Sequence, residues 1–355
     1  MIVDEGVFRE DHLPHRLLHR ESEVDTLLRA WEPAIYGDRP EDILMHGPSG
    51  VGKTVLSKHC ARKLRRESPV EVVRVRCINE TVPGILRQLL GELTGTKPAM
   101  NTPQAQLEAD LTDVISEPTI AILDEADDLP RTDLLKLLPE MGPVGLVAIA
   151  HDQTEWLARI DDDQVRSRFD GPGLAMERYG VAALADILDE RVRMGLSRGV
   201  VTRAHLEYIA DEVAGVARYG IQTLRESVLE AERCGADAIE RVHIDEGFEL
   251  AKFRIRQANI RSSGFHHRVL YELVRQSGRV SSRELHDQYE RVAEDVYANT
   301  PATPIGSRYR RDVLSKLVAY DLLRAHNETK YREYEVCDPE VRANIELPRS
   351  EQHAR

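Results

Sequence analysis

The stretch HGPSGVGKTVLSKHC, residues 46–60, decides the fold predicted for this chain. It joins the short apolar run DILMHG (42–47), which predicts a strand, to the amphipathic run VLSKHCARKLRRE (55–67), which predicts a helix. The glycines between them allow consecutive backbone N–H groups to point towards one anion, and the helix N-terminus adds its positive end. The stretch therefore predicts a phosphate-binding loop between a strand and a helix.

The spacing of the glycines, the lysine and the threonine predicts a nucleoside triphosphate as the ligand. Gly47, Gly52, Lys53 and Thr54 fit the pattern G-x-x-x-x-G-K-[ST]. The Lys53 ammonium would contact the β and γ phosphates, and the Thr54 hydroxyl would hold Mg²⁺. The residues expected to contact the nucleotide are Gly47, Pro48, Ser49, Gly50, Val51, Gly52, Lys53, Thr54 and Val55.

A second motif, ILDEAD (122–127), supplies the carboxylates that hydrolysis of ATP to ADP requires. Asp124 ends a predicted strand and would hold Mg²⁺ through water, together with Thr54. Glu125 would orient and deprotonate the attacking water. The alternative is a solvated acidic turn without a metal. We expect Asp127 and Asp128 to be solvated charges only.

Apolar runs that alternate with helical patterns place the phosphate loop in an α/β domain. Helical patterns separate the run 119–127, a predicted buried strand ending in carboxylates, from the apolar run 144–150 and the alternating run 70–77. This order predicts a parallel sheet with helices on both faces. Between residues 176 and 254 only helical patterns follow. We therefore expect a nucleotide-binding base over residues 1–175 and an all-helical lid over residues 176–254.

The C-terminal part has a different pattern, with three helices and then two short strands. A hairpin is predicted within residues 322–336, with its turn at Asn327-Glu328. Three helices followed by a hairpin are typical of a winged-helix domain, which we expect over residues 255–340. Residues 341–355 are predicted to be a flexible tail.

The charges are distributed unevenly along the chain. The formal net charge is −13, but residues 254–335 hold 15 Lys and Arg against 11 Asp and Glu. Such an asymmetry indicates a polyanionic partner for the C-terminal part. Only 8 of the 48 basic residues are lysines, and an acidic, arginine-rich composition is typical of proteins from salt-loving microbes.

Cysteine usage and hydropathy indicate the compartment. The four cysteines form no C-x-x-C pair, which favours reduced thiols in a cytosolic protein over a zinc or disulfide framework. The N-terminus lacks the apolar core of a signal peptide, and the apolar run 143–150 is too short to cross a bilayer. We expect a cytoplasmic protein with no membrane partner.

The order of these motifs resembles the AAA+ class and, within it, the archaeal origin-recognition initiator family, which is related to the eukaryotic origin-recognition and cell-division-cycle loading ATPases. The spacing of the two motifs carries the resemblance: seventy residues, which include one predicted strand, separate Lys53 from Asp124. The resemblance covers about residues 12–336. It implies an AAA+ base, a helical lid and a winged helix, with ATP or ADP and Mg²⁺ as cofactors. It also implies slow ATP hydrolysis, double-stranded DNA as a partner at origins or other specific sites, recruitment of the replicative helicase, and self-association on DNA.

The resemblance assigns residues on the base side of the nucleotide. LPHRLLHRESEV (13–24) resembles the segment that packs on the adenine, which makes His19 and Arg20 candidates for contacts to the base. RYGVAALADILDERV is similar to the start of the family's lid and contributes Tyr179 and Arg191.

The resemblance also assigns residues on the phosphate side. GVARYGIQTLRESVLEA (215–231) resembles the lid helix with the second sensor, so Arg218 would contact the γ phosphate. The first sensor, normally asparagine in this family, is His151 here; it would contact phosphate or water, or it is only a strand-end residue. Arg168 stands where the class keeps the arginine that reaches a neighbouring subunit's nucleotide, with Arg166 as the second choice. The alternative for both is a solvated pair of arginines.

The run SRYRRDVLSKL (307–317) is the candidate recognition helix. Its apolar residues would face the core and its cations would face the phosphates and base edges of DNA, while its first serine would cap the helix. The alternative is a helix that is merely soluble. The residues expected to contact DNA are Ser307, Arg308, Arg310, Arg311 and Lys316 in the helix and Lys330 and Arg332 in the wing.

Three functions fit the sequence. The first is a replication initiator that binds ATP and origin DNA and helps to load the replicative helicase. The second is a divergent paralogue that binds nucleotide and DNA as a regulator. The third is a signalling ATPase of the STAND type, in which the winged helix packs inside the protein. Exposure of the arginines of residues 308–316 on one face would favour the first two.

Overall fold

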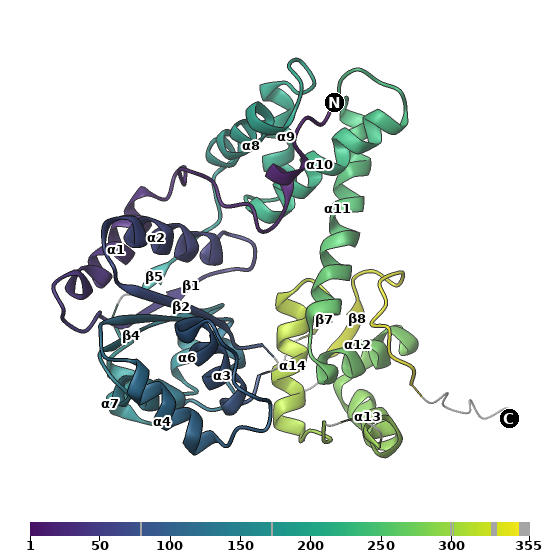
Figure 1. Ribbon diagram of the computed structural model, residues 1–355. Coiled ribbons are helices and arrows are strands. Elements are labelled where there is room, and N and C mark those ends of the chain that lie inside the picture. The colour runs from purple at the N-terminus through teal and green to yellow at the C-terminus, as the bar shows by residue number, and fades with distance from the viewer. Residues whose placement is uncertain (79, 172, 299, 301, 328–331, 348–355) are drawn as a thin grey trace, which may run out of the picture. The chain divides into compact units, whose positions relative to one another are not determined.

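The computed structural model describes residues 1–355 except for residues 79, 172, 299, 301, 328–331 and 348–355 (Figure 1). The described chain divides into two units, Met1–Gly247 and Phe248–Arg355. The division falls within helix α11 (Arg241–Ser262). We expected the lid to end at residue 254, but α11 continues past that residue without a break. Within the described ranges, no helix combines the length and the apolar character needed to cross a membrane.

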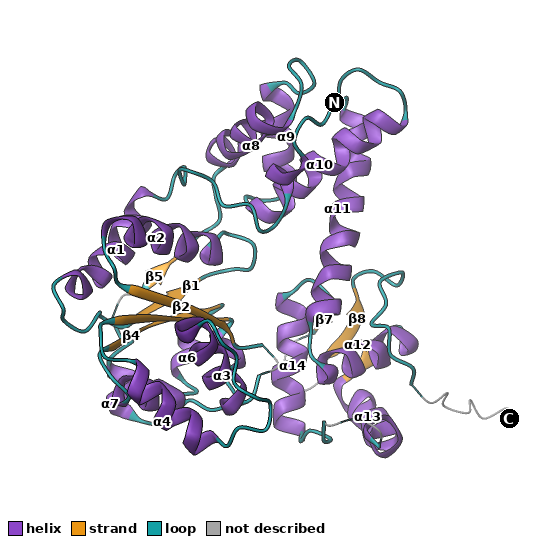
Figure 2. Cartoon of the chain, viewed as in Figure 1, coloured by secondary structure: helices purple, strands orange, loops and turns teal. Residues whose placement is uncertain are grey.

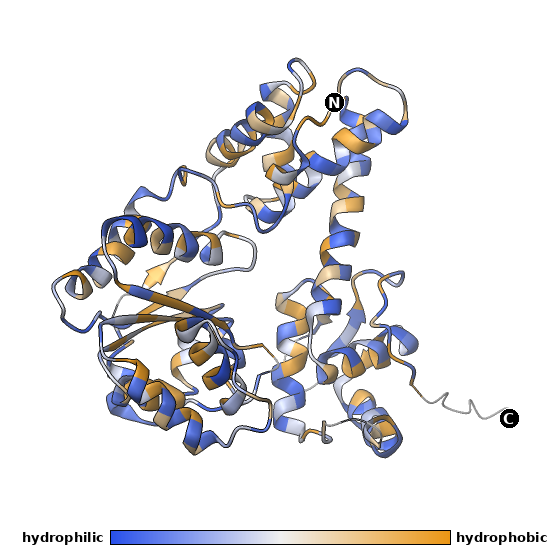
Figure 3. Ribbon diagram, in the orientation of Figure 1, coloured by the Kyte–Doolittle hydropathy of each residue, from blue (hydrophilic) through white to orange (hydrophobic). Residues whose placement is uncertain are grey.

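A five-stranded parallel sheet forms the middle of the first unit and confirms the predicted α/β class (Figure 2). Apolar residues run along its strands (Figure 3), and β3 and β4 are buried over their whole length. Adjacent strands β3, β4 and β1 end at the same edge, so the phosphate loop, Asp124 and His151 emerge side by side there. In sheet order the strands are β2 (Glu71–Arg76), β3 (Thr119–Asp124), β4 (Val144–Ala150), β1 (Ile43–His46) and β5 (Leu174–Ala175).

Helices cover both faces of this sheet because successive side chains of a strand point to opposite faces. In β3, Ile120 and Ile122 belong to the core shared with α1 and α2, whereas Ala121 and Leu123 belong to the core shared with α3 to α7. The helices are α1 (Glu21–Ile35), α2 (Lys53–Glu67), α3 (Val82–Thr94), α4 (Gln104–Val114), α5 (Leu134–Glu140), α6 (Gln153–Leu157) and α7 (Asp163–Ser167). A short 3-10 helix, η2 (Ala126–Asp128), follows β3.

The lid is helical, as predicted, but it also includes the N-terminus of the chain. Its helices are α8 (Val181–Gly195), α9 (Arg203–Glu212), α10 (Ala217–Arg233) and the beginning of α11. The short helix η1 (Glu5–Phe8) packs on α8 and α10, and the amides of Val3 and Asp4 donate to the carbonyl of Gly195. We expected these first residues in the base; they lie on the lid because the apolar side chains of Val7 and Phe8 are buried there.

The second unit has the predicted winged-helix layout. Three helices, α12 (Phe265–Ser277), α13 (Ser282–Tyr297) and α14 (Ser307–Ala319), surround one apolar core with the end of α11. The hairpin strands β7 (Leu323–His326) and β8 (Glu333–Val336) are joined by β6 (Val280–Ser281), a short strand that the sequence did not predict. Of the predicted turn, Asn327 lies in left-handed backbone, while Glu328 lies outside the described residues.

The expected tail beyond residue 341 is wrong for its first part. Val341, Ala343 and Leu347 are buried in the core of the second unit. The hydroxyl of Tyr271 donates to the carbonyl of Val341 at 3.1 Å. These apolar residues therefore complete the core of the winged-helix unit. Residues 348–355 lie outside the described part of the chain.

Candidate functional site

The phosphate loop has backbone geometry that requires glycine. Gly47, Gly50 and Gly52 have φ angles of 143°, 79° and 101°, in the left-handed half of conformational space. A Cβ on Gly47 would stand 2.2 Å from the carbonyl oxygen of Met176, so a side chain does not fit. The loop runs directly into α2, whose N-cap residue Gly52 has no side chain to cover the first N–H groups. The turn and the helix start therefore form an anion site.

Lys53 is folded back onto this loop. Its ammonium donates to the carbonyl oxygens of Gly47 at 2.5 Å and Pro48 at 2.8 Å. Burial lowers the pKa of Lys53, and the nearby carboxylates, Glu125 foremost, oppose that shift. A phosphate entering the loop would offer the ammonium a charged acceptor in place of two neutral carbonyls.

Thr54 and Asp124 meet at the end of β3. The Thr54 hydroxyl donates to both carboxylate oxygens of Asp124, at 3.0 and 3.2 Å. A hydroxyl beside a buried carboxylate is the donor set that Mg²⁺ takes in phosphate sites, so these residues fit the expected ion.

Arg74 also belongs to this site, although the sequence analysis missed it. Its Nη2 and Nε donate to the same oxygen of Asp124, at 2.5 and 3.1 Å. The sequence offered one indication of this role: Arg74 lies in β2, two residues before Arg76. In the sheet register Arg76 lies opposite Asp124 of β3. Recognising it required knowledge that β2 pairs with β3.

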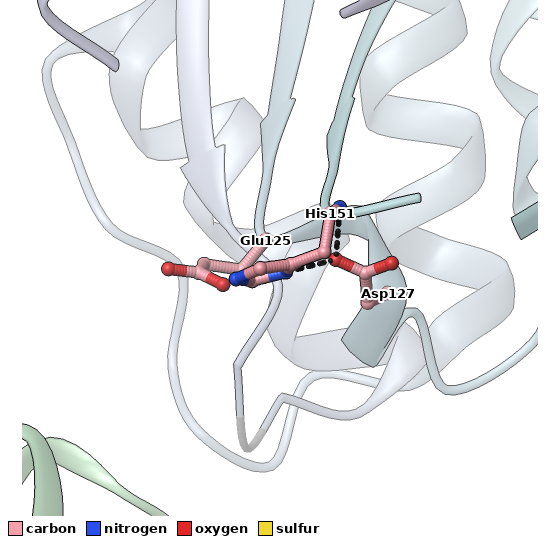
Figure 4. A group of neighbouring side chains, drawn as sticks. All are labelled: Glu125, Asp127 and His151. Carbon is pink, nitrogen blue, oxygen red and sulfur yellow. Dashed lines mark hydrogen bonds and ion pairs between the residues drawn. The ribbon is translucent and has the colours of Figure 1, made fainter. Parts of the chain in front are cut away.

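Glu125, Asp127 and His151 form a cluster in which His151 lies between the two carboxylates (Figure 4). One potential ligand atom from each residue lies within 4.8 Å of those of the other two. Nδ1 of His151 is 2.7 Å from Asp127, and the His151 amide donates to the same carboxylate at 3.0 Å. Asp127 is therefore not the solvated charge that we expected; it fixes the orientation of the imidazole because the ends of β3 and β4 are adjacent.

The lid contacts the phosphate loop through the start of α10. The Arg218 amide donates to the Gly50 carbonyl at 3.2 Å, and a Cβ on Gly50 would stand 2.7 Å from Cγ1 of Val216. The guanidinium of Arg218 pairs with Glu10, with Nε at 2.7 Å and Nη2 at 2.5 Å from the same oxygen. The second-sensor candidate therefore lies beside the loop, with a carboxylate as its present partner.

The base-side candidates connect the base to the lid. His19, in left-handed backbone, pairs with Asp186 of α8 at 2.9 Å. The buried Arg20 lies over the ring of Tyr179, 4.1 Å from its centroid, and burial raises the pKa of that tyrosine. Arg191 does not join them: it is buried in the lid and donates to the carbonyl of Val7 at 2.7 Å.

In this single chain, Arg168, the residue expected to reach a neighbouring subunit's nucleotide, contacts its own unit. Its Nε is 2.5 Å from the buried carboxylate of Asp42, and its Nη1 donates to the Leu135 carbonyl at 2.9 Å. Arg166, the second choice, pairs with Asp163 and donates to the Ile160 carbonyl. Arg168 and Arg39 together neutralise the buried carboxylate of Asp42, whereas the contacts of Arg166 are local to α7 and the turn before it.

Comparisons with known proteins decide the family. Residues 16–165 match the AAA ATPase domain and residues 185–249 match the Cdc6 AAA+ ATPase-type lid domain. ORC1-type DNA replication protein 9 of Halobacterium salinarum is 32% identical over 342 residues, which is 95% of this chain and 94% of that protein. This chain belongs to the ORC1-type DNA replication proteins. The expected family is therefore confirmed.

Other comparisons with ORC1-type proteins agree. ORC1-type DNA replication protein 3 of Haloarcula marismortui is 27% identical and covers 91% of this chain and 90% of its own. The fold is similar to that of the Aeropyrum pernix ORC1 protein in complex with DNA, with a TM-score of 0.72, 21% identity and coverage of 94% and 93%. It is also similar to the Aeropyrum pernix ORC2 protein in its ADPNP-ADP complexes, with a TM-score of 0.62, 22% identity and coverage of 97% and 96%.

The candidate recognition helix of this ORC1-type chain, α14, exposes only part of its predicted cationic face. Arg308 and Arg311 are exposed, as is Tyr309. Arg310 is buried, contrary to the prediction: it pairs with Glu290 at 2.7 Å and lies over the ring of Tyr289. Arg310 precedes Val313 and Leu314 by three and four residues, which places it on the core face of the helix.

The remaining DNA candidates are divided. Ser307 is exposed but makes no capping hydrogen bond, because the N-cap of α14 is Gly306. Lys316 is half-buried over the ring of Tyr320, and Arg332 is exposed beside β8. Lys330 lies outside the described residues.

Proposed function

We propose that this ORC1-type chain is an ATP-controlled replication initiator that binds origin DNA through its winged helix and helps to recruit the replicative helicase. The proposal rests above all on the contact between the Arg218 amide and the Gly50 carbonyl. Because phosphate loop and lid touch at this point, a nucleotide in the loop would contact both. The nucleotide state would then govern the angle between base and lid.

The roles of the nucleotide residues follow from their contacts. The Lys53 ammonium would donate to phosphate oxygens in place of the loop carbonyls. Thr54 and Asp124 would hold Mg²⁺, which would neutralise phosphate charge. Glu125 accepts a proton from the attacking water, and His151, oriented by Asp127, donates to the phosphate or positions that water. Hydrolysis is slow, because His151 stands where the family normally has the sensor asparagine.

Exposed cations support DNA as the partner of the second unit. Arg308, Arg311 and Arg332 are exposed, and an exposed guanidinium can contact phosphates and read guanine edges. This exposure favours the two DNA-binding functions over the STAND-type ATPase. We place the protein in the cytoplasm on the nucleoid, where it self-associates on DNA.

The test is genome-wide mapping of the DNA that the protein binds in cells, with an Arg308→Ala/Arg311→Ala variant as the control. We expect enrichment beside replication start points that the double substitution removes. Enrichment at scattered promoters instead would favour the regulator, and no enrichment in the wild type would refute both DNA-binding functions.

A further inference from the structure

The first fourteen residues form a strap, residues 1–14, that joins the lid to the helix of the phosphate loop. On the lid side, Arg191 donates to the Val7 carbonyl at 2.7 Å and Gln222 donates to the Phe8 carbonyl at 2.8 Å. The ring of Phe8 is fully buried. The strap is therefore fixed to α8 and α10 up to residue 8.

The other end of the strap is fixed to α2. Arg62 donates to the carbonyl of Leu13 at 3.2 Å and also to that of Pro14. Since α2 begins at Lys53, this anchor moves with the phosphate loop. Glu10 lies between the two anchors, so its carboxylate is held near the place where lid and loop meet.

The Glu10 carboxylate accepts hydrogen bonds from the guanidinium of Arg218, which lies in the first turn of α10. Both Nε and Nη2 of Arg218 contact one oxygen of Glu10, at 2.7 and 2.5 Å. The Arg218 side chain is 24% exposed and that of Glu10 is 56% exposed, so water and a ligand can reach the pair. The backbone of Arg218 is at the same time bonded to Gly50 of the loop.

We propose that Glu10 is a specificity-determining residue that competes with the γ phosphate of ATP for Arg218 and thereby reduces the preference of the site for ATP over ADP. The inference rests on the proposed nucleotide binding at this loop. A γ phosphate that takes the Nε and Nη2 edge of the guanidinium replaces the carboxylate, and the displaced carboxylate remains close to a triphosphate of the same sign. ADP lacks the γ phosphate and leaves the pair intact.

The size of the effect follows from the exposure of the pair. Half-exposed ion pairs contribute little, so removal of the carboxylate should strengthen ATP binding by about threefold to fivefold. The effect should shrink as salt is added, because salt screens charges that water reaches.

The test measures dissociation constants of the full-length protein for ADP and for a slowly hydrolysed ATP analogue, both with Mg²⁺, by calorimetric titration. We expect Glu10→Gln to raise the ratio of the ADP constant to the analogue constant by about threefold to fivefold, with the ADP constant itself unchanged. The matched control is Glu5→Gln. Glu5 is also on the strap, is similarly exposed, and pairs with Arg225 of α10, away from the loop; this ratio should stay at the wild-type value.

A second arm tests whether Arg218 carries the effect. In an Arg218→Gln background, Glu10→Gln should leave the ratio unchanged, because the group for which carboxylate and phosphate compete is gone. Three outcomes would each overturn the inference: a wild-type ratio in Glu10→Gln, a rise in Glu5→Gln equal to that in Glu10→Gln, or the same rise in the Arg218→Gln background. In each case, binding of ADP would still support the proposed function. Failure of the wild type to bind either nucleotide would overturn both.

Discussion

Individual side chains at the phosphate loop are satisfied before a ligand arrives. Lys53 donates to two loop carbonyls, Asp124 accepts from Thr54 and Arg74, and His151 bonds to Asp127. Buried polar groups rarely stay unpaired, and these internal contacts satisfy them. The ligand then replaces these partners, and its net affinity is the difference between two sets of contacts.

Lys53→Ala should abolish nucleotide binding, whereas Glu125→Gln should leave it intact and stop hydrolysis. The first removes the cation that faces the phosphates; the second keeps the shape of the side chain but removes the base. Titration with labelled ATP and a phosphate-release assay would measure the two effects. Equal ATP affinity of wild type and Lys53→Ala would refute the assignment of the phosphate loop.

Neighbouring arginines of α14 should behave differently. Arg310→Ala should lower the free energy of unfolding by about 1–2 kcal/mol, because it removes a buried side chain from Tyr289 and Glu290. Arg311→Ala should leave stability within about 0.5 kcal/mol and weaken DNA binding, with a smaller dependence of affinity on salt. Denaturant unfolding and DNA titrations at several salt concentrations would measure both. The same loss of stability in both variants would contradict the assigned orientation of α14.

At the scale of elements, the proposed function depends on the contact between the phosphate loop and the start of α10. The phosphate loop follows β1, and α10 begins beside it, with Val216 and Arg218 against Gly50. The motif between residues 46 and 60 predicted the loop from local spacing alone. The lid helix was predicted from its helical periodicity, and its sensor role from the resemblance. Its contact with Gly50 joins residues more than 160 positions apart and needed the folded chain.

Gly50→Ala should weaken nucleotide binding at least about tenfold, because its Cβ would stand 2.7 Å from Val216 and push the lid from the loop. Gly37→Ala is the control: its φ of 87° is close to the 79° of Gly50, yet a Cβ there meets nothing within 4 Å. Both variants should lose about 1 kcal/mol of stability from backbone strain. Equal nucleotide affinities of the two variants would show that contact between lid and loop does not matter for binding.

At the scale of the whole molecule, stability should depend on pH through buried histidine. Burial lowers the pKa of His267 in α12 to about 3, with smaller effects from Lys316 and His266. Below about pH 6.5 the unfolded chain takes up a proton that the folded chain refuses. The stability is therefore complete above pH 6.5 and declines as the pH falls towards 3.

The free energy of unfolding should fall by up to about 1.4 kcal/mol per pH unit from this residue alone. His267→Leu should reduce the slope between pH 6.5 and 5, while the same change at the exposed His15 should not. Denaturant titrations over this range would measure the slopes. Parallel slopes in wild type and His267→Leu would contradict the prediction.

The sequence by itself determined the phosphate loop, the α/β class, the helical lid and the winged-helix layout. Each depends on residues close together in the chain: a glycine pattern for the loop, apolar runs for the strands, helical periodicity for the lid and a hairpin turn for the wing. Only the tertiary structure decided which charges meet. Arg74 with Asp124, Asp127 with His151, Arg218 with Glu10 and Arg310 with Glu290 join segments from different elements, and Arg168 turns inward to Asp42. A charged residue has several possible partners in a sequence, and the packing of the apolar faces around it selects one.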